Sequence, residues 1–219
     1  MAEQWGNAAE SPQRTMAKNA DIRVLFVRTP ETEWERAGRL AGSTDVPLTA
    51  AGWEAVLAAM NGLQGTRLSS VLCGPDEASQ AVARELAKRT GCKVKVVEDF
   101  GEVHLGLWEG MLGTELQEKC PSAYRQWLDD PAAINAPEGE AFEDAQVRLV
   151  QALQRNTARV RGDSGSVGVV LRPMALGLVG CSVMGVPTKR LWSMIETAPL
   201  LEWRTVGKGE AQIRTGAGA

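Results

Sequence analysis

The sequence predicts an α/β fold with a mainly parallel central sheet. Short apolar runs that suit buried strands alternate with longer stretches whose apolar residues recur at helical spacing. The run 165–171 is almost entirely apolar, which is typical of a strand in the middle of a parallel sheet. The run 93–97 begins with lysines alternating with valines, so we expect that strand near an edge of the sheet.

The elements follow from these runs and from the residues that punctuate them. Strands are expected at 22–27, 68–73, 93–97, 165–171 and 200–206. Helices are expected at 49–63, 76–88, 113–129, 140–160, 174–184 and 189–195. Thr49 suits a helix N-cap, whereas Gly91 and Gly185 suit helix ends. We expect residues 29–49 to be a loop, and 101–139 to be a helical cap inserted over the carboxyl edge of the sheet.

Composition excludes several classes of partner. The chain has 219 residues, enough for one large domain, and its 24 basic against 27 acidic residues give a net charge of -3. No strongly basic run points to nucleic acid, and no apolar stretch reaches the length of a membrane span. The polar segment 1–20 and the Gly-rich segment 207–219 are predicted to be flexible tails around a domain at 21–206.

The four cysteines lack the spacing of a zinc site or a disulfide framework. We therefore expect reduced thiols in a cytoplasmic protein, with no metal and no cofactor.

Several separate stretches resemble one known family. The first is Arg-Thr-Pro-Glu-Thr at 28–32, and the others are 38–52, 102–110, 127–143 and 169–187. Their order and spacing are similar to those of the histidine phosphatase superfamily, the phosphoglycerate mutase-like proteins, whose opening motif is Arg-His-Gly-Glu-Thr. The resemblance implies a three-layer α/β/α fold with the active site at the carboxyl edge of the sheet.

The resemblance also assigns roles to particular positions. Arg28 matches the motif arginine that binds phosphate, and Glu102 matches the proton donor of the family. The two catalytic histidines fall on Thr29 and Arg172, and a second phosphate-binding arginine falls on Ala78. The asparagine that follows the first motif falls on a glutamate, Glu35.

The chain has one histidine, His104, which lies at neither catalytic position. Threonine lacks an activating base and arginine stays protonated at neutral pH, so neither replaces a nucleophilic imidazole. We interpret the chain as a catalytically inactive pseudophosphatase, a binding or regulatory module that keeps a relic anion pocket. The ligand-binding residues of that pocket would be Arg28, Arg172, Glu102 and Glu35.

Alternatives remain at this point. The chain could be a weak phosphatase acting on a phosphorylated small molecule without a phosphohistidine, using Glu102 with His104 or Cys73. For Cys73 a buried structural role is favoured, and for His104 a place on the rim beside a carboxylate.

The charges of the pocket also allow two interpretations. In the favoured interpretation, the arginines and glutamates neutralise one another as a buried ion network. In the other, Arg28 and Arg172 clamp an anionic ligand. The tryptophans are expected mainly in packing, although Trp108 and Trp127 could face a ligand. Partners left open are a phosphorylated small molecule, a protein partner and a second copy in a homodimer.

Overall fold

A computed structural model describes residues 22–158, 160 and 165–207 of the chain. The predicted tails, 1–20 and 207–219, lie outside the described residues except for Gly207. The sheet has five strands in the order β3-β2-β4-β1-β5. Their bounds are β1 Ile22–Arg28, β2 Ser70–Cys73, β3 Val94–Val96, β4 Ser166–Leu171 and β5 Leu201–Val206.

All five predicted strands are confirmed, with starts and ends that shift by at most two residues. β4 pairs in parallel with both β1 and β2, and β3 pairs in parallel with β2 at one edge, as expected. β5 runs antiparallel to β1 and closes the other edge. The carboxyl ends of the four parallel strands therefore meet at one side of the sheet, where ligand sites of such folds lie.

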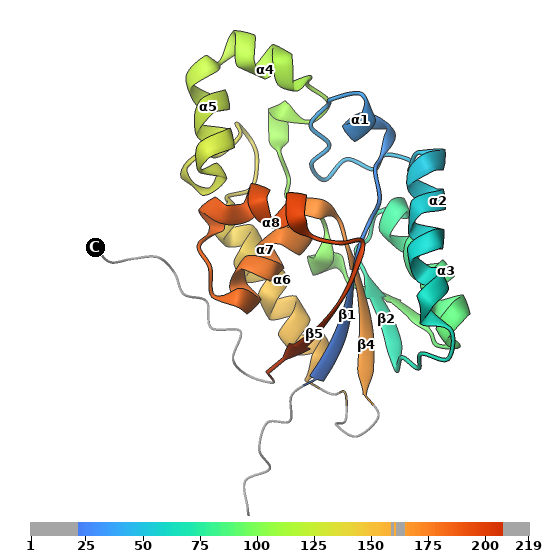
Figure 1. Ribbon diagram of the computed structural model, residues 1–219. Coiled ribbons are helices and arrows are strands. Elements are labelled where there is room, and N and C mark those ends of the chain that lie inside the picture. The colour runs from blue at the N-terminus through green and yellow to red at the C-terminus, as the bar shows by residue number, and fades with distance from the viewer. Residues whose placement is uncertain (1–21, 159, 161–164, 208–219) are drawn as a thin grey trace, which may run out of the picture.

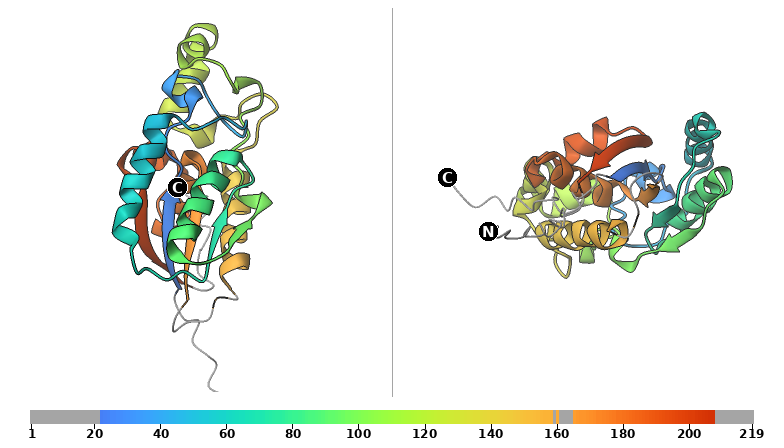
Figure 2. Two further views of the ribbon diagram at one scale, coloured as in Figure 1. Left: turned by 90° about the vertical axis from the view of Figure 1, so that its right-hand side faces the viewer. Right: turned by 90° about the horizontal axis from the view of Figure 1, so that it is seen from below.

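Helices cover both faces of this sheet, which gives the three-layer α/β/α arrangement that was predicted (Figures 1 and 2). On one face lie α2 (Ala50–Ala59) and α3 (Glu77–Thr90), and on the other lie α6 (Phe142–Thr157), α7 (Pro173–Met184) and α8 (Leu191–Thr197). The shorter helices are α1 (Glu33–Arg36), α4 (Gly113–Lys119) and α5 (Pro121–Asp129). Single 3-10 turns are η1 Met60–Leu63, η2 Glu98–Phe100, η3 Gly106–Trp108, η4 Pro131–Ala133 and η5 Thr188–Arg190.

The two core clusters use alternate residues of the same strands. In β1, Val24 and Phe26 pack toward α6 and α7, whereas Leu25 and Val27 pack toward α2 and α3. Gly168 in β4 permits a close approach on the second face, because a side-chain carbon there would lie 3.0 Å from Leu86 of α3. Burial on both faces explains why β4 is almost entirely apolar.

The helices begin and end at the capping residues that the sequence predicted. The Thr49 side chain accepts a hydrogen bond from the backbone N–H of Gly52 and caps α2. The Asp76 side chain does the same for Ser79 at the start of α3. Gly91 ends α3 and Gly185 ends α7, both in the left-handed conformation at φ 69° and 64°.

Three predicted elements need correction. The expected loop 29–49 contains α1, because Thr32 and Glu35 form a capping box that starts a helical turn. The expected helix 113–129 is broken into α4 and α5, because Pro121 disfavours a helical conformation at Cys120, whose φ is -138°. The expected helix 140–160 is shorter, with bounds Phe142–Thr157.

The segment 101–139 carries η3, α4, α5 and η4. α4 and α5 lie together beyond the carboxyl ends of the parallel strands (Figure 1). Their inward residues, among them Leu116 and Trp127, join the same core cluster as α6 and α7. Within the described residues, none of the helices is both long and apolar enough to cross a bilayer.

Candidate active site

A cavity of about 490 Å³ lies between the sheet domain and the 101–139 segment. Its wall is built from the loop around α1, from α5, from the start of α7 and from α8. The charged residues that line it are Glu35, Arg39, Glu102, Arg172 and Glu196. The remaining wall is mostly apolar and includes Leu40, Leu105, Tyr124, Trp127, Leu128, Met174, Trp192 and Ile195.

Glu102 lies in this wall and binds the N-terminus of α7. Its carboxylate accepts hydrogen bonds from the backbone N–H groups of Met174 at 2.9 Å and Ala175 at 2.7 Å, and from its neighbour Val103 at 2.8 Å. These groups need an acceptor because the first amides of a helix have no partner within it. Glu102 is 5% exposed, and this burial raises its pKa to about 7 against the opposing charge of Arg172 and the three backbone donors. The carboxyl group can therefore gain or lose a proton near neutral pH.

Arg172 follows β4 and occupies the N-cap position of α7. Its side chain is 2% exposed, and Nη1 donates to the carbonyl oxygen of Thr44 at 2.9 Å. Nε is buried and has no hydrogen-bond partner in the described part of the chain. The guanidinium thus keeps unused donors beside the cavity, as an anion-binding group requires.

Arg28 and Thr29 lie next to Arg172 in the sheet, since the backbone N–H of Thr29 donates to the carbonyl of Leu171. They do not line the cavity. Nη1 of Arg28 donates to the carbonyl oxygen of Ile195 at 3.0 Å, and Thr29 is 1% exposed. Ala78 is buried in α3 and does not line the cavity either. The structure therefore brings Glu102, Arg172 and Glu35 into one wall, and leaves Arg28, Thr29 and Ala78 outside it.

Glu35 lines the cavity, but its carboxylate is already engaged. Oε2 accepts hydrogen bonds from the backbone N–H of Thr32 at 2.7 Å and from its hydroxyl at 2.8 Å. The favoured interpretation of the charges, a network of ion pairs, is wrong: no salt bridge joins any two of Arg28, Glu35, Glu102 and Arg172, all of which are described. Each arginine instead donates to one backbone carbonyl, that of Ile195 for Arg28 and that of Thr44 for Arg172.

The two alternative reactive groups are not placed for catalysis. Cys73 is fully buried, and this burial raises the pKa of its thiol to about 12, so the nucleophilic thiolate is absent at neutral pH. The predicted structural role of Cys73 is the one its burial supports. His104 is exposed and contacts Ser43 at 2.9 Å and Glu109 at 3.0 Å rather than Glu102. The alternative, a pair of His104 with Glu102, is therefore wrong, and the favoured rim position beside a carboxylate is correct.

Among the charged and aromatic lining residues, sequence reasoning missed four: Arg39, Tyr124, Trp192 and Glu196. A signal existed for Arg39, which is the single basic residue within the family-like stretch 38–52. Of the two tryptophans considered, Trp127 lines the cavity and Trp108 is buried behind it. In the described residues, no group of three or more acidic, histidine or cysteine side chains could hold a metal ion.

This geometry can be compared with known proteins. A profile of the histidine phosphatase superfamily (branch 1) matches residues 24–213. The chain belongs to this superfamily. It is 26% identical over 172 residues to phosphoserine phosphatase 1 of Hydrogenobacter thermophilus, covering 78% of this chain and 81% of that protein. It is 25% identical over 171 residues to the adenosylcobalamin/alpha-ribazole phosphatase of Escherichia coli K12, covering 78% and 83%.

A solved structure agrees with this membership. Bacillus stearothermophilus YhfR matches with a TM-score of 0.73 and 24% identity, covering 81% of this chain and 85% of that one. The likeness confirms the phosphoglycerate mutase-like fold predicted from the sequence. Ligand sites of open α/β sheets lie beyond the carboxyl ends of the strands, where the cavity lies in this chain.

The comparisons overturn one expectation, that the chain is a catalytically inactive pseudophosphatase. Histidine phosphatase relatives that cover about four fifths of the chain are named as phosphatases. The fold is therefore one of enzymes, and the relatives favour the alternative reading, a phosphatase.

Proposed function

We propose that this protein is a phosphatase that hydrolyses the phosphate ester of a small molecule, with water rather than a histidine as the nucleophile. One observation carries the proposal: Glu102, whose pKa is raised to about 7, lies with the cation Arg172 in the wall of a cavity large enough for a small molecule. A proton donor beside a fixed cation is the minimum that phosphate ester hydrolysis needs. The names of the relatives support the same reaction class.

In the proposed reaction, Arg172 and Arg39 bind the non-bridging oxygens of the phosphoryl group. Water attacks phosphorus in line with the ester bond, so that an O–P bond forms as the ester O–P bond breaks. Glu102 gives its proton to the leaving oxygen, which departs as an alcohol. The attacking water loses a proton to solvent, and Glu102 regains one from solvent before the next turnover.

Water is assigned as the nucleophile because the other groups are unsuited to that role. Cys73 is buried with a pKa of about 12, and the hydroxyl of Thr29 lies outside the cavity wall. The one histidine of the chain, His104, binds Ser43 and Glu109 at the surface. Direct attack by water lacks covalent catalysis, so we expect slow turnover.

The experiment measures phosphate release by the purified full-length protein from p-nitrophenyl phosphate, benzyl phosphate and a sugar phosphate. We expect release by the wild type and a loss of about 100-fold in Arg172→Gln, because a preorganised charge on the phosphoryl group is removed. Arg155→Gln is the matched control, since Arg155 is an exposed arginine paired with Asp99 on the surface. Its rate should equal that of the wild type.

Two results would overturn the proposal. One is no phosphate release above the level of Arg172→Gln on any of the esters. The other is activity that disappears in His104→Asn or Cys73→Ser, which would assign the reaction to a different group. A thermal melt of each variant establishes that it is folded before its rate is interpreted.

Other properties accompany this proposal. The substrate is taken to be a phosphorylated small molecule, and the protein to act in the cytoplasm with its four unpaired thiols reduced. A homodimer and a protein partner also remain proposals, which gel filtration of the purified protein addresses.

A further inference from the structure

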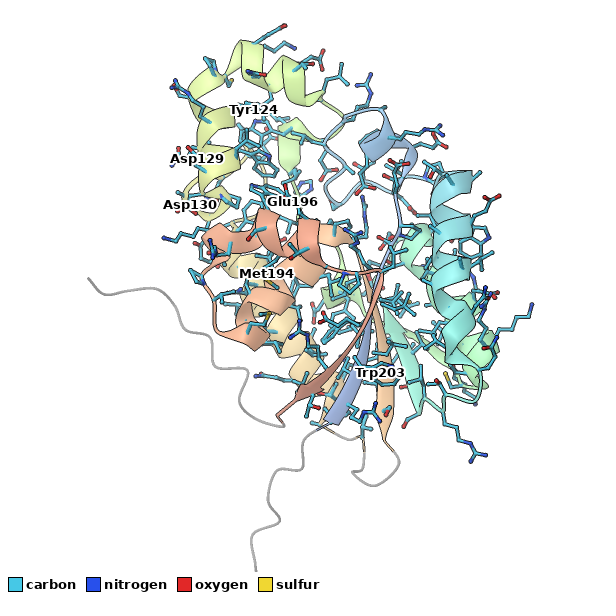
Figure 3. All side chains as sticks on the ribbon, viewed as in Figure 1. Tyr124, Asp129, Asp130, Met194, Glu196 and Trp203 are labelled. Carbon is cyan, nitrogen blue, oxygen red and sulfur yellow. The ribbon has the colours of Figure 1, made fainter. Side chains whose placement is uncertain are left out.

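Aromatic side chains form one wall of the cavity. Tyr124 and Trp127 come from α5, and Trp192 comes from α8 and contacts Trp127. Figure 3 shows Tyr124 on α5 and Glu196 on α8 facing the space between the two helices. Aromatic rings gathered in one wall favour a flat ligand, because such a ligand can lay one face against them.

This wall is held in place before any ligand arrives. The indole Nε1 of Trp192 donates to the carbonyl oxygen of Trp127 at 2.6 Å, and their ring centroids lie 4.8 Å apart. Trp127 also packs edge-on against Trp108 at 5.5 Å and against Phe142 at 5.6 Å, both of which are buried. A ligand that docks on these rings therefore does not have to order them, which lowers the entropic cost of binding.

The buried pair Glu102 and Arg172 is separated from the aromatic residues, and Glu196 is the one charged lining residue on the helices that carry those aromatics. Glu102 and Arg172 are held at the N-terminus of α7, whereas the aromatic residues lie on α5 and α8. A phosphate at Arg172 would leave the rest of the molecule against the aromatic and aliphatic wall. A polyhydroxylated group there would lose hydrogen bonds to water without gaining enough protein partners, which is costly.

We propose that the substrate is a phosphate ester of a flat, largely apolar alcohol. The alcohol is the leaving group, and it carries an aromatic ring. The inference rests on the proposed function, since it places the phosphate at Arg172 and the leaving group on the wall of the same cavity. Trp192 is the specificity-determining residue, because it is the more exposed of the two coupled indoles: Trp192 is partly buried, whereas Trp127 is buried.

The experiment measures binding, which does not require turnover. Isothermal titration compares benzylphosphonate with methylphosphonate, two probes with the same uncleavable headgroup that differ in the ring. We expect the wild type to bind benzylphosphonate at least about tenfold more tightly than methylphosphonate, since the ring buries apolar surface. Trp192→Leu should lose most of this preference while its affinity for methylphosphonate stays the same.

Trp203→Leu is the matched control. Trp203 is a partly buried tryptophan on β5, low on the sheet and away from the cap, where it stacks with Arg23 (Figure 3). This variant should keep the full preference. Tyr124→Leu provides a second variant of the wall should Trp192→Leu fail to fold, and it should also weaken the preference for the ring.

The outcomes separate this inference from the proposed function. Equal affinity for the two phosphonates, or a preference that both Trp192→Leu and Tyr124→Leu retain, would overturn the aromatic substrate class. Release of phosphate from a sugar phosphate faster than from benzyl phosphate would overturn it as well. Tight binding of benzylphosphonate without hydrolysis of benzyl phosphate supports the binding preference and overturns the proposed hydrolysis.

Discussion

Two glutamates in one short stretch, Glu102 and Glu109, have opposite electrostatic surroundings. Glu102 is buried at the start of α7, and although three backbone amides bind it, burial raises its pKa to about 7. Glu109 is also partly buried, which opposes ionisation, yet hydrogen bonds from Thr44, Leu105 and Ser43 lower its pKa to about 2. The same side chain can thus lose or gain a proton near neutral pH at one position and stays ionised at the other.

The difference lies in the donors that reach each carboxylate. Both the backbone N–H and the hydroxyl of Ser43 and of Thr44 donate to Glu109, as does the backbone N–H of Leu105. Glu109 thereby fixes the loop whose carbonyl at Thr44 receives Arg172. Glu102 receives fewer donors and is 5% exposed. One glutamate does the chemistry proposed for the site, and the other holds the cation of that site in place.

The largest expected effect follows from replacing Glu102 with glutamine, which keeps the shape and removes the proton. We expect kcat to fall by about 100-fold or more, because a general acid contributes that much to ester hydrolysis. In the wild type, kcat should fall about tenfold per unit as pH rises above 7, since the protonated form is the active one. The slope should vanish in Glu102→Gln.

The measurement is a pH–rate profile on benzyl phosphate from pH 5 to 9, with a thermal melt at each end. The melt is required because Glu102 also caps α7. A rate that is unchanged in a folded Glu102→Gln variant would remove the distinction between the two glutamates. A profile that rises with pH above 7 would indicate a base in place of an acid.

A smaller effect, on stability rather than on chemistry, is expected for Glu109→Gln. The free energy of unfolding at pH 7 should drop by about 2–4 kcal/mol, because donors that now meet a carboxylate lose a charged acceptor. A carboxylate whose pKa is lowered on folding stabilises the folded protein at pH values above the pKa of that carboxylate in the unfolded chain. The difference between wild type and variant should therefore be full above about pH 4.5 and shrink toward pH 2.

Urea unfolding of wild type and variant at pH 7 and pH 3 measures this difference. Glu118→Gln on α4 is the matched control, since Glu118 is exposed. It should change the unfolding free energy little at either pH. A loss for Glu109→Gln that is no greater than for Glu118→Gln would refute the proposed anchoring of the loop.

The fold could be predicted because the spacing of apolar residues within short segments determines which segments form strands and which form helices. Apolar runs located all five strands, and Thr49, Gly91 and Gly185 located helix ends. α1 was not predicted, although Thr32 and Glu35 have the spacing of a capping box. The family resemblance gave Glu35 a role in ligand binding instead of a role in starting a helix.

The site could be predicted only in part. Glu102 and Arg172 were found from motifs, but the partners of Glu102 lie 72 and 73 residues further along the chain. The expected ion network failed because backbone carbonyls at Thr44 and Ile195 take its place. Every residue offers such a carbonyl, so no pattern in the sequence marks which of them will meet an arginine.

The smallest expected effect is that of His104→Asn. His104 is exposed, with 53% of its side chain accessible, and its partners Ser43 and Glu109 also bind each other at 3.0 Å. We expect a loss of about 0.5 kcal/mol in unfolding free energy, as for an exposed charge pair, and an unchanged kcat. Urea unfolding and the benzyl phosphate assay measure the two quantities. A large loss of kcat would place the reaction beside Glu109 instead of Glu102, and would reverse the roles assigned to the two glutamates.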